Sequence, residues 1–241
     1  MTYCVGLLLD QGMVLLSDTR TNAGLDNIAT YRKMFVFEEP GERVVTILTA
    51  GSLSVTQTTI ARLREAIEHP ETSADTSIMQ APTMLAVAEI IGNTLASVRQ
   101  DIDHKMNASK VTVSASMIVA GQRRGGAMRM FLVYPEGNFI EATEDTPFLQ
   151  IGEHKYGKPI LDRVVRPATS LEDAQKAVLL SMDSTLRSNL SVGMPLDLAV
   201  IARDACKVGL RKRIEKDDAQ FAAMSQAWSE ALRDGFGRIT L

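Results

Sequence analysis

The first residues of the chain could supply a catalytic nucleophile. The sequence starts Met1-Thr2-Tyr3, a good context for removal of the initiator methionine. Its removal would leave Thr2 with a free α-amine beside its own hydroxyl. The hydroxyl can attack a carbonyl carbon while the α-amine, with a pKa of about 7.7–8.0, accepts its proton directly or through water. Met-Thr is also a common start, so these two residues alone do not establish a catalytic threonine.

Two charged residues are predicted to approach Thr2. The apolar runs on either side of the turn at Gln11 are expected to pair as a hairpin, which would place Asp18 nearly opposite Cys4. Lys33 precedes the next predicted strand and can reach the same point. A cation there lowers the pKa of the threonine hydroxyl, and a carboxylate holds that cation in place. Each charge alone is more often a solvated surface group, but the three residues together are a more specific pattern.

A glycine could complete such a site. The segment Thr49-Ala50-Gly51-Ser52 lies between a predicted strand and a predicted helix. Backbone N–H groups at the start of a helix can stabilise an oxyanion. A simple strand-to-helix turn also favours glycine. Gly51 therefore indicates an oxyanion hole only in combination with Thr2, Asp18 and Lys33.

Other kinds of site lack a signal. The sequence contains no Gly-Lys-Ser/Thr phosphate loop, no Gly-x-Gly-x-x-Gly after a strand and no His-Glu-x-x-His. The three histidines are dispersed, and Cys4 and Cys206 are the only thiols. Two cysteines supply neither a disulfide framework nor a cysteine zinc site. We therefore predict no metal and no cofactor.

Composition limits the class of protein. The chain has 241 residues, 45% hydrophobic and 23% charged, with a net charge of −3. Such a balance is typical of a globular domain and favours neither nucleic acid nor a membrane surface as partner. No apolar run approaches the roughly 20 residues that span a bilayer. The N-terminal segment lacks the pattern of a signal peptide, so we expect the cytoplasm.

The predicted elements come in blocks of strands and blocks of helices. Strands are expected at Val5–Leu9, Met13–Leu16, Met34–Phe37, Val44–Thr49, Val111–Gly121, Ala127–Tyr134, Phe139–Ala142, Phe148–Ile151, Leu196–Arg203 and Val208–Ile214. Helices are expected at Ser52–Glu68, Thr83–Lys105, Lys158–Val165, Ser170–Ser188 and Phe221–Leu232, and residues 19–30 are expected to be irregular. This order favours one α+β domain over residues 1–241, with two antiparallel sheets at its centre and helices on both outer faces.

The four site elements resemble the proteasome β-subunit superfamily, which has the N-terminal-nucleophile hydrolase fold. The resemblance extends from Thr2 to about Arg203, and residues 204–241 form a C-terminal extension. It is carried by Thr2-Tyr3-Cys4-Val5-Gly6, Ser17-Asp18-Thr19-Arg20, Thr30-Tyr31-Arg32-Lys33-Met34 and the segment Asp183–Gly193, which look specifically like Anbu, the bacterial branch regarded as an ancestral β subunit. The resemblance implies a four-layer α-β-β-α sandwich.

The resemblance also implies a role for each matched residue. Thr2 would be the nucleophile and its amine the base, with Lys33 as the activating cation, Asp18 as its partner and the Gly51 N–H in the oxyanion hole. Weaker assignments are Asn22, where the family holds the substrate main chain, Asn189, near a supporting aspartate, and Ser188 or Ser191, either of which could supply an accompanying hydroxyl. Gly152-Glu153 falls where proteasomes place a serine near the threonine. Glu153 and Asn189 thus depart from the family pattern.

The sequence is compatible with three functions. The first is a threonine peptidase or amidase that cleaves a peptide or amide substrate, and the second is a self-assembling scaffold with a weak or silent site. The third, an α+β domain with a coincidental Met-Thr start, would require the Asp18, Lys33 and Gly51 segments to match by chance. The resemblance implies a homo-oligomer, either a ring or an open helical assembly, but the sequence determines neither the number of subunits nor an ATPase partner. The charged segment Lys216–Asp234 could serve assembly or cover its own subunit.

Overall fold

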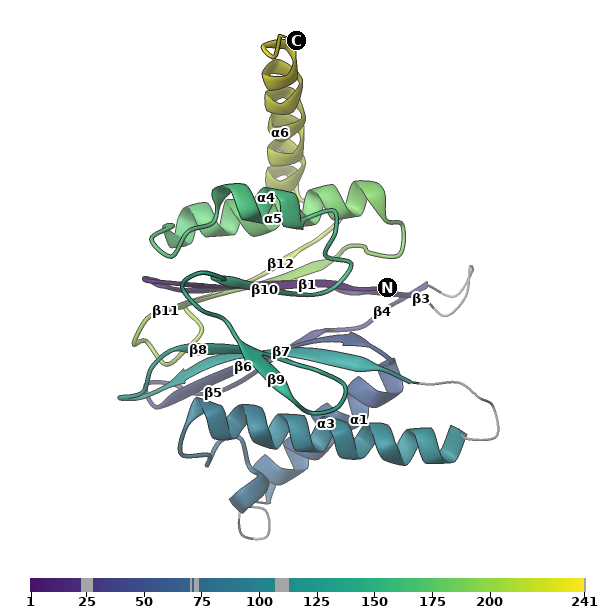
Figure 1. The fold of residues 1–241 in the computed structure, drawn as a ribbon, viewed down its shortest axis with the longest axis vertical. Coiled ribbons are helices and arrows are strands. Elements are labelled where there is room, and N and C mark those ends of the chain that lie inside the picture. Colours follow the sequence, from purple (N-terminus) through teal and green to yellow (C-terminus); the bar gives the residue numbers. More distant parts are fainter. Residues whose placement is uncertain (23–27, 70, 72–73, 107–112, 241) are drawn as a thin grey trace.

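Two stacked sheets lie between two layers of helices in the computed structural model (Figure 1). The structure describes residues 1–22, 28–69, 71, 74–106 and 113–240. One five-stranded antiparallel sheet has the order β10-β1-β2-β11-β12, and the other has the order β5-β6-β7-β8-β9. The four-layer α+β sandwich predicted from the sequence is confirmed.

The first sheet contains the start of the chain. Its strands are β1 (Tyr3–Leu9), β2 (Gly12–Asp18), β10 (Phe148–Gly152), β11 (Leu196–Ala202) and β12 (Leu210–Ile214). The hairpin β1–β2 pairs Cys4 with Ser17, so Asp18 lies one residue beyond the partner of Cys4, as the predicted hairpin requires. β10 pairs with the other edge of β1 and brings Gly152 opposite Tyr3.

The second sheet carries the glycine of the candidate site. Its strands are β5 (Met34–Glu39), β6 (Arg43–Gly51), β7 (Ala115–Arg123), β8 (Arg129–Val133) and β9 (Phe139–Glu141). Helices α1 (Leu53–Glu68) and α3 (Met84–Met106) cover its outer face, and a short 3-10 turn, η1 (Ala74–Thr76), lies between them. Helices α4 (Lys158–Val164) and α5 (Leu171–Ser188) cover the first sheet (Figure 1). The predicted cap of α5 is present, since the Ser170 side chain accepts a hydrogen bond from the Asp173 N–H.

Continuous apolar runs form these central strands because both faces of each sheet are covered. One apolar cluster lies between the sheets and includes Cys4, Leu15, Leu48 and Ile118. The other two clusters lie between each sheet and its own helices. Every residue of β1 except Leu8 is therefore buried, as is every residue of β2.

The structure corrects the prediction for residues 19–30. Two short strands, β3 (Arg20–Asn22) and β4 (Ile28–Thr30), pair there with each other, and residues 23–27 lie outside the described part of the chain. Strands of three residues are too short to show a period of two, so the sequence pattern could not reveal them. The first residues of the predicted strand Val111–Gly121 are also outside the described part, and β7 begins at Ala115.

The last helix, α6 (Ala219–Gly237), is longer than the predicted Phe221–Leu232 and projects away from the sandwich (Figure 1). None of its residues is buried. Its base is attached to α5, because the Ser225 hydroxyl donates to Asp183 Oδ1 at 2.6 Å and Arg187 donates to Ser225 at 2.7 Å. Across the described residues, none of the helices has the length and apolar character needed to cross a membrane.

Candidate active site

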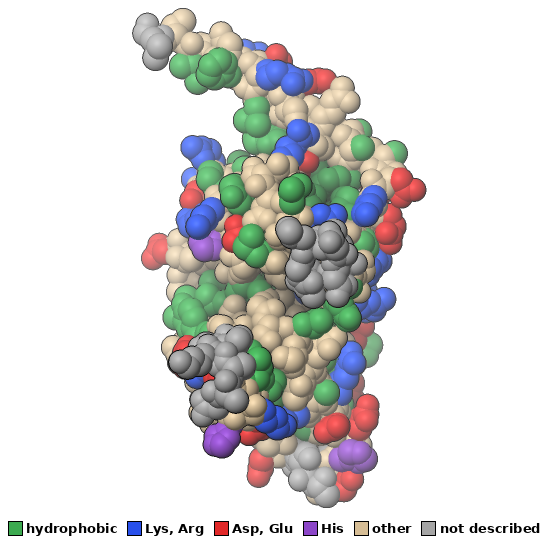
Figure 2. Space-filling view, turned by 90° about the vertical axis from the view of Figure 1, so that its right-hand side faces the viewer, with side chains coloured by type: hydrophobic (Ala, Val, Ile, Leu, Met, Phe, Trp, Pro, Cys, Tyr) green, Lys and Arg blue, Asp and Glu red, His purple; other side chains and the backbone are tan. Residues whose placement is uncertain are grey.

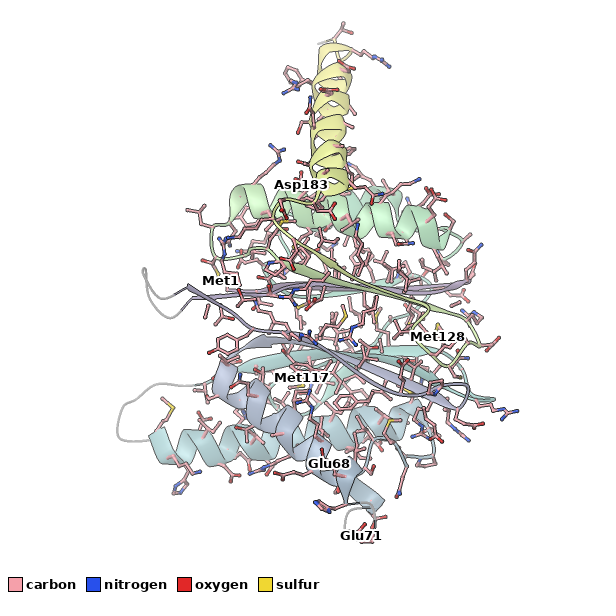
Figure 3. All side chains as sticks on the ribbon, turned by 180° about the vertical axis from the view of Figure 1, so that it is seen from behind. Met1, Glu68, Glu71, Met117, Met128 and Asp183 are labelled. Atoms are coloured by element: carbon pink, nitrogen blue, oxygen red, sulfur yellow. The ribbon has the colours of Figure 1, made fainter. Side chains whose placement is uncertain are left out.

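Thr2 is held at the N-terminal end of β1, next to the end of β10. Its carbonyl oxygen accepts a hydrogen bond from the Glu153 N–H at 2.7 Å. Gly152 has a φ of +82°, and a Cβ on this residue would overlap the carbonyl oxygen of Thr2. A glycine is thus required where β10 passes the threonine. Thr2 is 8% exposed, whereas Met1, still bonded to it, is 60% exposed just before the start of β1 (Figure 3).

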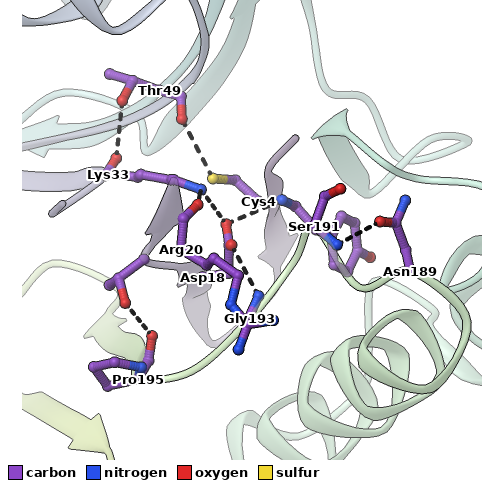
Figure 4. A network of polar contacts seen from close by, with 11 residues as sticks. Cys4, Asp18, Arg20, Lys33, Thr49, Asn189, Ser191, Gly193 and Pro195 are labelled. Atoms are coloured by element: carbon purple, nitrogen blue, oxygen red, sulfur yellow. Dashed lines mark hydrogen bonds and ion pairs between the residues drawn. The ribbon is translucent and has the colours of Figure 1, made fainter. Parts of the chain in front are cut away.

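Asp18 and Lys33 form a buried ion pair beside Thr2. Lys33 Nζ donates to Asp18 Oδ1 at 2.7 Å and to the Arg20 carbonyl at 2.6 Å (Figure 4). The Asp18 side chain is fully buried and that of Lys33 is 7% exposed. Asp18 Oδ1 also accepts from the Tyr3 N–H at 3.1 Å, which links the carboxylate to the residue that follows Thr2.

The surroundings of Asp18 act on its protonation in opposite directions. Burial raises the pKa of the Asp18 carboxyl, and the charge and hydrogen bond of Lys33 oppose this rise most strongly. The N–H groups of Tyr3 and Gly193 oppose it further. Lys33 is therefore the main group that keeps Asp18 available as a carboxylate, and Asp18 in turn fixes the position of Lys33.

Cys4 lies two residues after Thr2, but its thiol is not suited to act as a nucleophile. Burial raises the pKa of its thiol well above the usual range, and the Sγ atom contacts the Thr49 carbonyl at 3.6 Å between the sheets. A buried neutral thiol is a poor nucleophile. Of these two residues, Thr2 is thus the better candidate for a nucleophile.

A cavity of about 340 Å³ opens in front of these residues. It is lined by Met1, Thr2, Thr21, Arg32, Lys33, Thr49, Ala50, Gly51, Ser52, Leu53 and Thr56. Gly51 ends β6 with a φ of +105°, and a Cβ there would overlap the Ser114 carbonyl. The structure therefore brings the backbone of Gly51, the first turn of α1, Lys33 and Thr2 to one cavity.

The loop after α5 supports Asp18 through its backbone. Asn189 is buried at the end of α5, and its Oδ1 accepts from the Ser191 N–H at 2.9 Å. The Gly193 N–H, two residues further on, donates to Asp18 Oδ2 at 3.2 Å (Figure 4). Asn189 thus shapes the loop that holds the carboxylate.

The remaining predicted residues are less closely connected to the site. Ser188 is exposed as the last residue of α5, and no described hydrogen bond joins it to Asp18 or Lys33. Ser191 contributes its backbone N–H as described. Asn22 ends β3, but its side chain lies outside the described part of the structure.

Sequence patterns missed the backbone groups that complete the site. The Tyr3 and Gly193 N–H groups and the Arg20 carbonyl carry no side-chain signal, so only the folded positions of their segments reveal them. The Tyr3 hydroxyl was also missed. It pairs with Ser181 Oγ and accepts from Gln150 Nε2, both at 2.6 Å, and burial raises its pKa to about 12.

Carboxylate, histidine and cysteine side chains do not gather elsewhere into a metal site. Within the described residues, no group of three or more of them is placed to hold a metal ion.

Comparisons with known proteins point to one family. The model of the proteasome subunit family matches residues 2–201. An Anbu mutant from Hyphomicrobium sp. strain MC1 is 47% identical with a TM-score of 0.93, covering 100% of this chain and 99% of the other. Anbu from Yersinia bercovieri is 40% identical with a TM-score of 0.91, covering 99% and 98%.

A third solved structure describes the helical assembly of the Anbu complex from Pseudomonas aeruginosa. That protein is 43% identical with a TM-score of 0.92, and the match covers 99% of this chain and 97% of the other. Among curated proteins, none matches the chain significantly. The structural similarities include the C-terminal residues beyond the family model.

Proposed function

Because the chain belongs to the proteasome subunit family, we propose that it is a threonine peptidase or amidase that acts through Thr2 once Met1 has been removed. The observation that carries this proposal is the buried Lys33–Asp18 pair at 2.7 Å, whose lysine lines the same cavity as Thr2 and Gly51. A lysine held this way can lower the pKa of a neighbouring hydroxyl. The full-length similarity to Anbu proteins supports the same proposal.

The proposed reaction is an acyl transfer. Thr2 Oγ1 attacks the substrate carbonyl carbon while the Thr2 α-amine takes the hydroxyl proton. The resulting oxyanion is stabilised by the Gly51 N–H, and Lys33 favours the charged oxygen of the nucleophile. The C–N bond then breaks, the α-ammonium returns the proton to the leaving amine, and an ester to Thr2 remains. Water, deprotonated by the same amine, hydrolyses the ester and regenerates Thr2.

Removal of Met1 is a condition of this mechanism. With Met1 attached, the Thr2 nitrogen is an amide, which cannot accept a proton. Met1 also lines the cavity in front of Thr2. Its removal would therefore create the base and enlarge the space for substrate in one step.

Assembly with further copies of the chain is part of the proposal. The apolar residues Phe221, Met224, Trp228, Leu232 and Phe236 recur at three- and four-residue steps along α6, and Ile239 follows just beyond its end. Leu232, Phe236 and Ile239 are 54%, 81% and 72% exposed, and Figure 2 shows hydrophobic side chains along the projecting helix. An exposed stripe of this kind is typical of a surface that another chain covers. We propose a second copy as that chain, in a ring or in a helical array such as that described for the Pseudomonas aeruginosa complex.

A self-assembling scaffold with a silent site is the second candidate function. It is supported by the family resemblance, which implies a serine and an aspartate where this chain has Glu153 and Asn189. Glu153 approaches Thr2 through its backbone N–H, and Asn189 reaches Asp18 only through the loop it shapes. The cytoplasmic location predicted from the sequence stays a prediction for either function.

Intact-mass measurement before and after treatment with a peptidyl epoxyketone tests the proposal. We expect protein purified from its native host to lack Met1 and to gain one adduct, which peptide mapping should assign to Thr2. Thr2→Ala should abolish the adduct, and Lys33→Ala should slow its formation on the order of 10²-fold or more. An adduct that persists in Thr2→Ala would exclude Thr2 as the nucleophile. A processed chain with no adduct would favour the scaffold.

A further inference from the structure

The two cationic side chains that line the cavity differ in their partners. Lys33 is paired with Asp18, but Arg32 has no such ion-pair partner. Arg32 is exposed, and none of the described residues forms an ion pair or a side-chain hydrogen bond with it. The described lining includes no aspartate or glutamate. Arg32 thus places on the wall beside the proposed nucleophile a guanidinium that forms no ion pair with a described carboxylate.

The carboxylate near Arg32 acts on it only through space and is shared with a second arginine. Asp197 in β11 interacts electrostatically with Arg32 and forms an ion pair through Oδ1 with Arg213 at 3.2 Å, while its buried Oδ2 has no hydrogen-bond partner among the described residues. Arg20 differs from Arg32, because its guanidinium donates a hydrogen bond to the Leu190 carbonyl at 2.8 Å. Arg32 lines the cavity, whereas Arg20 does not, and none of the described side chains pairs with Arg32.

We propose that Arg32 selects substrates with a carboxylate on the acyl side of the cleaved bond, an inference that rests on the proposed hydrolysis through Thr2. A guanidinium binds a carboxylate through two parallel hydrogen bonds, which gives both affinity and orientation. Thr21, Ser52 and Thr56 also line this wall, with the Thr56 hydroxyl donating to the Leu53 carbonyl at 3.1 Å and the Ser52 hydroxyl paired with that of Ser54 at 3.0 Å. Removal of Met1 takes away one of its apolar side chains.

The position of Arg32 concerns the acyl part of the substrate because that part stays in the cavity. After the C–N bond breaks, the amine departs and the acyl group remains esterified to Thr2. A glutamyl residue offers a carboxylate at this position in two ways. In an α-linked glutamyl amide the side-chain carboxylate is free, and in a γ-linked one the α-carboxylate is free, with the same number of carbon atoms between it and the reacting carbonyl. Both present the same chemistry to Arg32.

Covalent labelling with matched epoxyketones tests this inference. The probes differ only in the residue next to the electrophile, which is α-linked glutamate, γ-linked glutamate, glutamine or leucine, and the rate of adduct formation is followed by intact mass. We expect one of the glutamate probes to react on the order of 10-fold or more faster than the glutamine probe, which has the same shape without the charge. The faster of the two glutamate probes identifies the linkage.

Substitution of Arg32 separates recognition from general charge. Arg32→Gln should reduce the glutamate preference to about twofold or less, while Arg124→Gln, which removes an exposed arginine outside the cavity, should leave it unchanged. The preference should also weaken as salt is raised, because the Arg32 side chain is exposed. Equal labelling by the glutamate and glutamine probes, or a preference that survives Arg32→Gln, would overturn the inference and leave the proposed hydrolase standing.

A binding measurement keeps the two proposals distinguishable if no probe reacts. The Thr2→Ala variant is titrated with two acetylated tripeptide amides that differ only in ending with glutamate or glutamine. Tighter binding of the glutamate peptide, by on the order of 10-fold and lost with Arg32→Gln, would support carboxylate recognition even where Thr2 fails to react. Equal affinity for the two peptides together with unreactive probes would overturn both proposals.

Discussion

Replacing Lys33 by methionine should destabilise the fold by about 3–5 kcal/mol, because it leaves the Asp18 carboxylate buried without its counter-ion. Asp18 has no exposed surface and Lys33 is 5% exposed, so their 2.7 Å contact lies out of water. Methionine is about as long as the aliphatic part of lysine and packs adaptably. The decrease in the free energy of unfolding should therefore come from the missing charge rather than from poorer packing. For a chain of this size it corresponds to a fall of roughly 6–20 °C in Tm.

The loss should grow with pH. Burial raises the pKa of Asp18, and Lys33 opposes this rise most strongly. Without Lys33 the folded pKa is higher still, while the unfolded carboxyl keeps a pKa of about 3.9. The folded variant then holds a proton that the unfolded chain releases, so its stability is greatest below about pH 4 and falls as the pH rises toward the folded pKa.

Urea unfolding at pH 5 and pH 8 measures both effects, with the protein concentration held constant because the chain is proposed to assemble. The variant should lose more stability relative to the parent protein at pH 8 than at pH 5. Asp18→Asn combined with Lys33→Met removes both charges and should be more stable than the sum of the single losses predicts, by about 0.5–3 kcal/mol. A loss below about 1 kcal/mol that is the same at both pH values is what a solvated surface pair would give, and it would refute the argument.

Two further substitutions test the positioning of Thr2 and the role of α6. Gly152→Ala should cost about 1–3 kcal/mol in thermal unfolding and slow labelling of Thr2, because the new methyl group meets the Thr2 carbonyl at a positive φ. Gly125→Ala is the matched control, since it also has a positive φ but meets no atom within 4 Å, and an equal loss in both would assign the effect to φ alone. Leu232→Ser on the exposed stripe of α6 should lower the assembly mass in light scattering at low concentration, whereas Arg233→Ser should not. An unchanged mass for Leu232→Ser would remove the α6 stripe from the assembly interface.

The sequence was sufficient for the layers of the fold and for the approach of Asp18 to the start of β1. Continuous apolar runs marked the central strands, because strands covered on both faces need no polar alternation. The turn at Gln11 set the register of the β1–β2 hairpin, and this register places Asp18 next to the partner of Cys4. The helical spacing of apolar residues located α1 and α3 to within one residue at each end.

The features that the sequence could not predict are those that depend on backbone groups and on distant segments. The hydrogen bond from Gly193 to Asp18 joins residues 175 positions apart and uses an N–H that any residue would provide. The contact of Gly152 with Thr2 likewise depends on β10 pairing with β1 rather than on a local motif. The sequence also could not predict that Arg32 lines the cavity without an ion-pair partner, because this depends on how separate segments fold around the cavity.

The buried ion pair also bears on whether the chain is an enzyme or a scaffold. Burying two charges stabilises a fold no better than neutral residues of similar size, so assembly alone gives no physical need for Asp18 and Lys33. A reaction at Thr2 does need them, because the cation acts on the hydroxyl only where water is excluded. We therefore expect the Asp18→Asn/Lys33→Met variant to assemble like the parent protein in light scattering and to lose labelling by the epoxyketone. If the variant fails to assemble while the parent protein is also unreactive, the pair serves the structure, and the scaffold becomes the better account of the site.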